Sequence, residues 1–521
     1  MRFARALAPV LLVAVLSQSS VEADVLARIV KKAPDDKGGG NAAADLTAWA
    51  GPARPTSLPE LLGLAVRQAP SLQAARFDIA VAEARIEQTF GRNDWNLQAQ
   101  LDVTHQRFLG NDTIDINPTT IGGSVSIGRA LPSGGTIGVN ARGSYDRGFQ
   151  FVELEGMERT ILTELHTGGV SVALTQPLMR GRGSFIFNAN ERKARLSRDA
   201  SVLAKRLVAI QTVQAVVSAY WDLVLAERAL AITTSSLDLA KERLRITQIG
   251  NDGGKVPRSE IPAVQQIIAT REEDVLNGEL TVLDRSIALR RAVGMPIGKG
   301  ELGLRVGGEL QTRDVGFEIG QLTESAFTAS PELAQIKKQD QSALIDIEVT
   351  ENGLLPQLDA ALSAGPSAFG TSFGETWKSV GKFDAISITG TLTLQQSIGR
   401  DEVKGRAREQ RELRRKLQVT EFDIRAQIAQ TMARAVAQLE VAKRRVALTQ
   451  RAIDLANENI KIESDRFNLG KATNFDVLNR QEELRQAELR KAQAIIDWHK
   501  GEAVVQALTG DILPTYGITV D

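Results

Sequence analysis

The second half of this chain repeats the first at a fixed shift of 216 residues, over roughly seventy positions and without a gap. One apolar series at seven-residue intervals starts at Leu223 and returns from Leu439; a second starts at Leu225 and returns from Val441. The shift also relates three further pairs: Gly254 and Gly470, Glu260 and Asp476, Gly294 and Gly510. Heptads sustained over this length are typical of long packed helices. The repeat therefore predicts a duplicated helical architecture, and no catalytic motif recurs with it.

Composition argues against several classes of function. The chain has 63 basic and 63 acidic residues, so a polybasic surface for nucleic acid is not expected. It has no cysteine, which excludes disulfides, thiolate metal sites and an acylated lipoprotein N-terminus. The three histidines, His105, His166 and His499, are isolated, and no HExxH, nucleophile elbow or phosphate loop is present. We therefore predict no enzyme, no metal site and no cofactor.

The first 23 residues have the pattern of a secretory signal peptide. Arg2 and Arg5 precede an apolar run over residues 6–16, and small side chains near residue 23 fit cleavage before Asp24. An uncleaved anchor is the alternative, but the run is shorter than the ~20 residues of a membrane-spanning helix. No other uncharged stretch approaches that length, so we expect an exported chain without a transmembrane helix.

Glycine, proline and helical periodicity divide the exported part. Residues 24–56 predict a flexible N-terminal arm, residues 57–296 a first structural repeat, residues 297–512 a second repeat, and residues 513–521 a C-terminal tail. Each repeat is expected to hold one helix, then strands, then a long helical hairpin. The predicted helices are 58–90, 188–249 and 259–293 in the first repeat, and 319–351, 402–469 and 474–508 in the second.

The segments between the first helix and the hairpin alternate apolar and polar residues, as strands do. In the first repeat these segments are 97–103, 125–127, 137–140 and 170–174, with a tight turn at 132–135; in the second they are 358–362 and 386–394. Segments of about ten residues match the strands of outer-membrane barrels. A soluble β-domain explains the same alternation, and the strands alone leave both interpretations open.

The two heptad series lie two residues apart, which is about 200° around a helix. Each long helix therefore carries apolar stripes on nearly opposite sides and needs a neighbour on each. A ring of helices meets this need, whereas a helix in a globular core is apolar all round. One chain supplies too few helices for a ring, so we predict a cyclic homo-oligomer whose copy number the helices leave undetermined.

The chain resembles TolC-type outer-membrane efflux proteins over about residues 57–512. The resemblance lies in the duplicated hairpins, in Pro70 and Pro331 at helix starts, in Thr175-Gln176-Pro177-Leu178 after a strand, and above all in residues 466–470 followed by 474–478. It implies a mainly α protein with a membrane β-barrel part: a trimeric α-helical barrel continuous with a shared barrel in the outer membrane. Its partners would be outer-membrane lipid, a periplasmic adaptor (membrane fusion) protein and an inner-membrane pump.

By motif position, the resemblance places Asp476, Asn479 and Glu260 at a pore constriction, where family members carry rings of acidic side chains. It places Gly254, Arg466, Phe467, Leu469, Gly470 and Lys471 at a periplasmic tip that docks on the adaptor. Asp476 has a second interpretation, as an acidic residue at the N-terminus of a helix. A Tyr and an Arg that hold the family's entrance shut correspond to Phe467 and Ala472, so that polar latch cannot form here.

Two questions stay open at the level of the sequence. Family members usually contribute four strands per chain to a twelve-stranded barrel, whereas the turn at 132–135 allows six strands here and eighteen in the barrel. The main function predicted is the exit duct of a tripartite efflux pump or a type I secretion system, gated at its tip. The alternative is a periplasmic coiled-coil adaptor, which should carry one hairpin rather than two; a soluble coiled-coil protein is a third, weaker possibility.

Overall fold

The computed structural model describes residues 54–106, 118–154, 157–254, 256–298, 302–307, 312–313 and 316–519. The chain divides into two units, residues 1–49 and 50–521, and every described residue belongs to the second. The predicted signal peptide, 1–23, lies outside the described residues, as does the predicted N-terminal arm, 24–56, apart from its last three residues.

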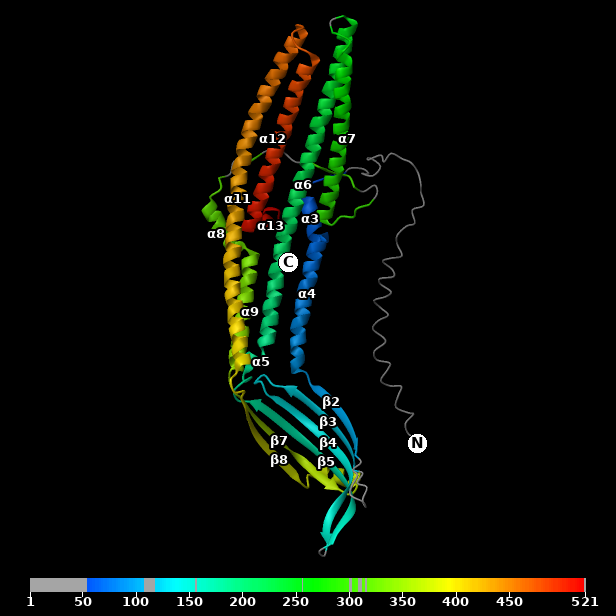
Figure 1. The fold of residues 1–521 in the computed structure, drawn as a ribbon, viewed down its shortest axis with the longest axis vertical. Coiled ribbons are helices and arrows are strands. Elements are labelled where there is room, and N and C mark those ends of the chain that lie inside the picture. Colours follow the sequence, from blue (N-terminus) through cyan, green and yellow to red (C-terminus); the bar gives the residue numbers. More distant parts are fainter. Residues whose placement is uncertain are drawn as a thin grey trace, which may run out of the picture. The chain divides into compact units, whose positions relative to one another are not determined.

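The helices form two hairpins with shorter helices beside them (Figure 1). Their bounds are α3 Leu58–Gln68, α4 Pro70–Phe90, α5 Ser184–Phe187, α6 Ala189–Asp252, α7 Glu260–Val293, α8 Ile319–Ala329, α9 Pro331–Gly353, α10 Phe373–Lys382, α11 Asp401–Asn468, α12 Asn474–Thr509 and α13 Ile512–Thr515, with a 3₁₀ turn, η1, at Gly91–Asn93. Helix α6 packs against α7, and α11 against α12; α4 and α9 lie along the remaining lengths of α6 and α11. The long helices therefore occur where the heptads predict them.

The helix expected over 58–90 is in fact two helices, and so is the one expected over 319–351. The breaks fall at Ala69 and Ser330, whose ψ angles are 123° and 116°. Each precedes a proline, which lacks an N–H and disfavours helical geometry in the residue before it. The expectation of single helices was wrong because it passed over this steric effect.

The largest apolar core surrounds the middle of α6. It includes Val213 and Leu223 of α6, Leu61 of α3 and Leu289 of α7, all fully buried. Two short strands, β1 (Arg54–Thr56) and β6 (Leu304–Val306), pair in parallel beside it. One window of α6 is long and apolar enough to span a membrane, contrary to the sequence expectation, but more than half of it is buried within the chain. Its composition is explained by its place in this core.

Six strands form one antiparallel sheet in the order β2-β3-β4-β5-β7-β8 (Figure 1). Their bounds are β2 Asn96–His105, β3 Thr119–Ala130, β4 Thr136–Leu154, β5 Met157–Pro177, β7 Gln357–Gly370 and β8 Ile386–Gln395. All six expected strands are present, but β4 and β5 have 19 and 21 residues and exceed the expected length of about ten. Helix α10, which the sequence did not predict, lies between β7 and β8.

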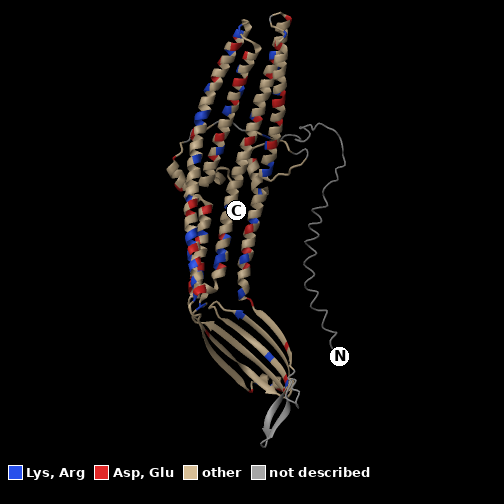
Figure 2. Cartoon of the chain, viewed as in Figure 1, with Lys and Arg blue, Asp and Glu red and all other residues tan. Residues whose placement is uncertain are grey.

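The sheet has one apolar and one polar face. Leu97, Ile127, Val139, Val172 and Ile388 lie on one face, because the pairing register aligns their strands across the sheet. All five are between 39% and 72% exposed. Their chain neighbours point to the opposite face and are mostly Ser, Thr, Gln, Asn or Gly. Figure 2 shows charged residues dispersed along the helices and sparse on the strands.

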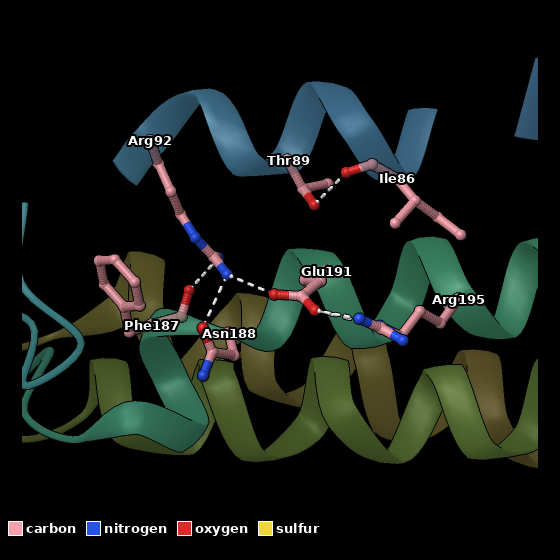
Figure 3. A network of polar contacts seen from close by, with 7 residues as sticks. All are labelled: Ile86, Thr89, Arg92, Phe187, Asn188, Glu191 and Arg195. Atoms are coloured by element: carbon pink, nitrogen blue, oxygen red, sulfur yellow. Dashed lines mark hydrogen bonds and ion pairs between the residues drawn. The ribbon is translucent and has the colours of Figure 1, made fainter. Parts of the chain in front are cut away.

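A polar network around Arg92 lies where the helices meet the sheet (Figure 3). The guanidinium of Arg92, on η1, donates to Asn188 Oδ1 at 2.7 Å and to the Phe187 carbonyl, and its Cζ lies 4.4 Å from the Phe187 ring centroid. It also pairs with Glu191 at 3.1 Å, and Arg195 binds the same carboxylate at 2.8 Å. The network holds the start of α6 against η1, directly before β2 begins.

Candidate functional site at the hairpin tips

The turns of the two hairpins lie at the end of the helices farthest from the sheet (Figure 1). Gly254 follows α6 and Gly470 follows α11, and both adopt a φ of +71°, which favours glycine. The same φ angle at two positions 216 residues apart shows that the two turns have similar backbone geometry, as the sequence repeat predicts. Of the predicted tip residues, Gly254, Leu469, Gly470 and Lys471 lie on these turns, whereas Arg466 and Phe467 lie in the last turn of α11.

Asp476 forms a capping box with Thr473 at the N-terminus of α12. The Asp476 N–H donates to the Thr473 hydroxyl at 3.3 Å, and the Thr473 N–H donates to Asp476 Oδ2 at 2.8 Å. That backbone hydrogen bond, with the one from the Thr473 hydroxyl and the charges of Arg466 and Arg480, lowers the pKa of Asp476. The carboxylate is thus held ionised and stabilises the helix N-terminus.

Glu260 links the first hairpin to the second. Its Oε2 accepts the backbone N–H of Asn474 at 3.3 Å, so the first residue of α7 binds the first residue of α12. Asn474 is 1% exposed, and its side-chain amide has no hydrogen-bond partner. The bond to Glu260 satisfies the backbone N–H of Asn474, and its loss would leave a further polar group of this buried residue unpaired, which is costly.

Two more contacts join the hairpins within a short distance of the tip. The Arg243 guanidinium of α6 lies over the Phe467 ring of α11, with Cζ 5.3 Å from the centroid, and burial lowers the pKa of Arg243. Arg271 of α7, which is 5% exposed, pairs with Glu482 of α12 at 3.2 Å. An apolar cluster from α6, α7 and α12 lies between these polar contacts: Leu237, Ala240, Val264, Ile268 and Leu478.

The remaining predicted residues are mostly at the surface. Leu469 is 71% exposed, and Asn479 and Lys471 are also exposed. Arg466 pairs with Glu463 at 3.2 Å within α11, and the Lys471 N–H closes the turn on the Arg466 carbonyl at 2.8 Å. Of the predicted constriction residues, Glu260 contacts the first residue of α12, whereas Asn479 lies farther along α12 and is exposed.

Sequence reasoning missed the residues that tie the hairpins together: Arg243, Arg271, Thr473, Asn474 and Glu482. One of them had a local signal, since Thr473 and Asp476 have the spacing of a capping box. Arg243 and Arg271 had none, because a charged residue on a helix is usually solvated and only the packing of two hairpins buries them. Among the described residues, no three His, Asp or Glu side chains gather closely enough to hold a metal ion.

Residues 322–511 match the model of the outer membrane efflux protein family. No curated protein sequence matches the chain. The fold is similar to that of the outer membrane protein VceC of Vibrio cholerae (TM-score 0.62, 12% identity, 87% of this chain and 96% of that chain). It is also similar to the Campylobacter jejuni CmeC outer membrane channel (TM-score 0.62, 13% identity, 92% of this chain and 94% of that chain) and to the outer-membrane channel OprN (TM-score 0.65, 14% identity, 92% and 98%). The sequence match to this family thus covers most of the second repeat, and the fold of the chain is similar to that of outer-membrane channels.

Proposed function

We propose that this protein is the outer-membrane exit duct of a tripartite efflux pump or a type I secretion system. The observation that carries the proposal is the six-stranded sheet, exposed and apolar on one face and polar on the other, continuous with two long helical hairpins. Such a sheet suits a barrel wall with lipid outside and water inside. A sheet of a soluble domain would bury its apolar face.

The oligomer is proposed to be a homotrimer, as in the family. In α11, Leu439 of the first heptad series is 1% exposed and belongs to an apolar cluster with Trp498 and Val505 of α12. The second heptad series of α11 is exposed to solvent in the single chain: Val441, Leu448, Leu455 and Ile462 are 51% to 62% exposed. On the opposite side of the chain, Phe77 of α4 and Leu276 of α7 are 69% and 59% exposed.

These two sets of apolar residues lie on the outer helices of the chain, because α6 packs between α4 and α7 on one side and α9 and α12 on the other. Head-to-tail contact between copies would bury both sets at once, as a closed ring requires. An open groove between α11 and α12, lined partly by Val441, Arg445 and Val504, would receive side chains of the neighbouring copy.

The tip is proposed to close the duct. Asp476, Asn479 and Glu260 would line the constriction, and Gly254, Arg466, Phe467, Leu469, Gly470 and Lys471 would form the surface that docks on a periplasmic adaptor with its inner-membrane pump. The exposed Leu469 supports a docking role, since a large apolar side chain at a turn suits a protein contact. The domain organisation predicted from the sequence, including a cleaved signal peptide, is part of this proposal.

Substitutions on opposite faces of one central strand test the proposal. Val172 lies on the apolar face of β5 and its neighbour Ser171 on the polar face. Arginine at a lipid-facing barrel position costs about 2–4 kcal/mol near the membrane midplane. Val172→Arg should therefore abolish or strongly reduce heat-resistant trimers in outer-membrane fractions, whereas Ser171→Arg should leave them. Equal effects of the two substitutions, or a native protein absent from that fraction, would favour the adaptor.

A further inference from the structure

The sheet of one chain has two open edges. Strands β2 and β8 each pair on one side only, and in the described residues they do not pair with one another. Both have ten residues, and all ten are exposed in each. Unpaired backbone groups are not tolerated against lipid, so a sheet in a membrane must close on itself or on a copy. Six strands are fewer than the eight of the smallest membrane barrels.

The two edges are compatible with one another. Strand β2 leads away from the helices after η1, and β8 leads back into α11, so β8 of one copy beside β2 of the next would run antiparallel. Apolar residues of β8 such as Leu392 then share a face with Leu101 of β2, and Thr391 shares the opposite face with Gln100. An edge-to-edge contact therefore continues both faces of the sheet without interruption.

The helices adjoining the two edge strands also have exposed apolar residues that a neighbouring copy would cover. Strand β2 follows α4, which carries the exposed Phe77, and β8 precedes α11, which carries the exposed Phe422. The Arg92 network in Figure 3 holds the junction before β2 to α6. A neighbouring chain that covers the exposed apolar residues of α11 would therefore bring its own β2 beside β8.

We propose that β8 of each chain pairs with β2 of the next, so that three copies form a barrel of eighteen strands, six from each. This inference rests on the proposed function and on its trimer. The diameter of a barrel grows roughly linearly with strand number, so the lumen would be about half again as wide as that of a twelve-stranded barrel. The duct would then admit cargo of larger cross-section at its outer end.

The described residues leave this lumen unfilled. The polar face carries small side chains, among them Ser126, Ser171 and Thr391. Helix α10 lies on the other face, since a Cβ atom added at Gly143 or Gly168, both on the apolar face, would meet Trp377 at 3.3 Å. The helix therefore covers part of the outer surface instead of plugging the barrel.

Cysteine cross-linking tests the edge contact directly, because the chain has no native cysteine. Cysteines on the polar face of β2 (at Gln98, Gln100 or Asp102) would be combined with cysteines on the polar face of β8 (at Thr389, Thr391 or Thr393). We expect at least one combination to give disulfide-linked trimers in outer membranes, and none of the single variants to do so. A Ser126→Cys, Asn140→Cys pair, on facing positions of β3 and β4, is the control that should close within one chain.

Barrel width is tested by a variant that lacks residues 119–154 and hence β3 and β4, which leaves four strands per chain with unchanged direction. Neutral polymers added to the β-barrel side of a bilayer should enter the native lumen up to a diameter about 1.5-fold that admitted by the variant. Equal limits for the two proteins would overturn the inference. So would native trimers in which the control pair forms but no β2–β8 pair does, and this result would leave the proposed function intact. Failure of the native chain to insert would overturn both.

Discussion

Arg243 lies over the ring of Phe467 and joins the first hairpin to the second, at the position where family members are expected to carry a tyrosine latch. The contact needs only the ring face of Phe467, so the missing hydroxyl does not prevent it. Burial, which lowers the pKa of Arg243, strengthens such a contact because water competes less for the cation. The two hairpins are thus tied by a cation–π pair in place of a hydroxyl hydrogen bond.

Phe467→Ala should loosen the tip. A cation–π contact contributes about 0.5–2 kcal/mol, so the ratio of separated to joined hairpins should rise roughly 2- to 30-fold per chain. Channel conductance of the purified protein in planar bilayers measures this. Phe467→Tyr keeps the ring and should behave as the native protein. If the alanine variant conducted no better than the tyrosine variant, Arg243 and Phe467 would have no role in closure.

Glu260→Ala should also separate the hairpins, because it leaves the buried N–H of Asn474 without its partner. Such a group costs about 1–3 kcal/mol. The expected result is a lower unfolding temperature with faster proteolysis at the tip. Ser259→Ala is the matched control, since the neighbouring Ser259 makes no capping hydrogen bond. A similar loss of stability in both variants would show that the link from Glu260 is unimportant.

The two proposed roles of Asp476, lining the pore and capping α12, can be separated by two substitutions. Asp476→Asn removes the charge but keeps an oxygen that can accept from Thr473, whereas Thr473→Ala removes the cap and keeps the charge. If Asp476 lines the pore, the asparagine variant should lose cation preference while the alanine variant retains it. Loss of the cap should lower stability by about 0.5–2 kcal/mol. Unchanged ion selectivity in Asp476→Asn would leave Asp476 with a capping role alone.

Glu227 should make stability depend on pH. Burial raises its pKa above 4.5, although the Val306 N–H and the charge of Arg305 oppose the shift. Because the carboxyl pKa is higher in the folded state, the protonated Glu227 adds to the free energy of unfolding below pH 4.5. This contribution is lost as the pH rises through the folded-state pKa. Glu227→Gln should therefore raise the unfolding temperature more at pH 7.5 than at pH 4.

Glu242→Gln serves as the control for that pH dependence. Its carboxyl is exposed on the same helix, and the hydrogen bond from Arg245 lowers its pKa. Removing this carboxylate should bring no gain in stability at pH 7.5. A gain of the same size in both variants would show that the effect of Glu227 does not come from its burial.

The sequence predicted the long helices and the six strands because heptads and strict alternation are local patterns that packing reinforces. It predicted the turns at Gly254 and Gly470 because glycine at the end of a helical pattern is itself a local signal. The sequence prediction failed at Ala69, because Pro70 disfavours helical geometry in the residue before it, and hydrophobic periodicity does not detect this steric effect. Helix α10 was missed because its ten residues are too few for a clear period, and its place is set by Trp377 against Gly143 and Gly168.

At the candidate site, sequence indicated where the chain turns but not what holds the turns together. Arg271 and Glu482 are far apart in the sequence and each occupies an ordinary position on a charged helix. Their pairing depends on how α7 packs against α12. The partners of such residues follow from tertiary contacts, which no local pattern of a single sequence encodes.

Single-channel recording of the purified native protein in planar bilayers tests the central claim most directly. An outer-membrane duct should insert from detergent as a trimer and give discrete conductance steps, which should become larger in Phe467→Ala as its tip opens. A folded protein that produces no steps, either as the native chain or as the opened variant, would contradict the assignment as a channel.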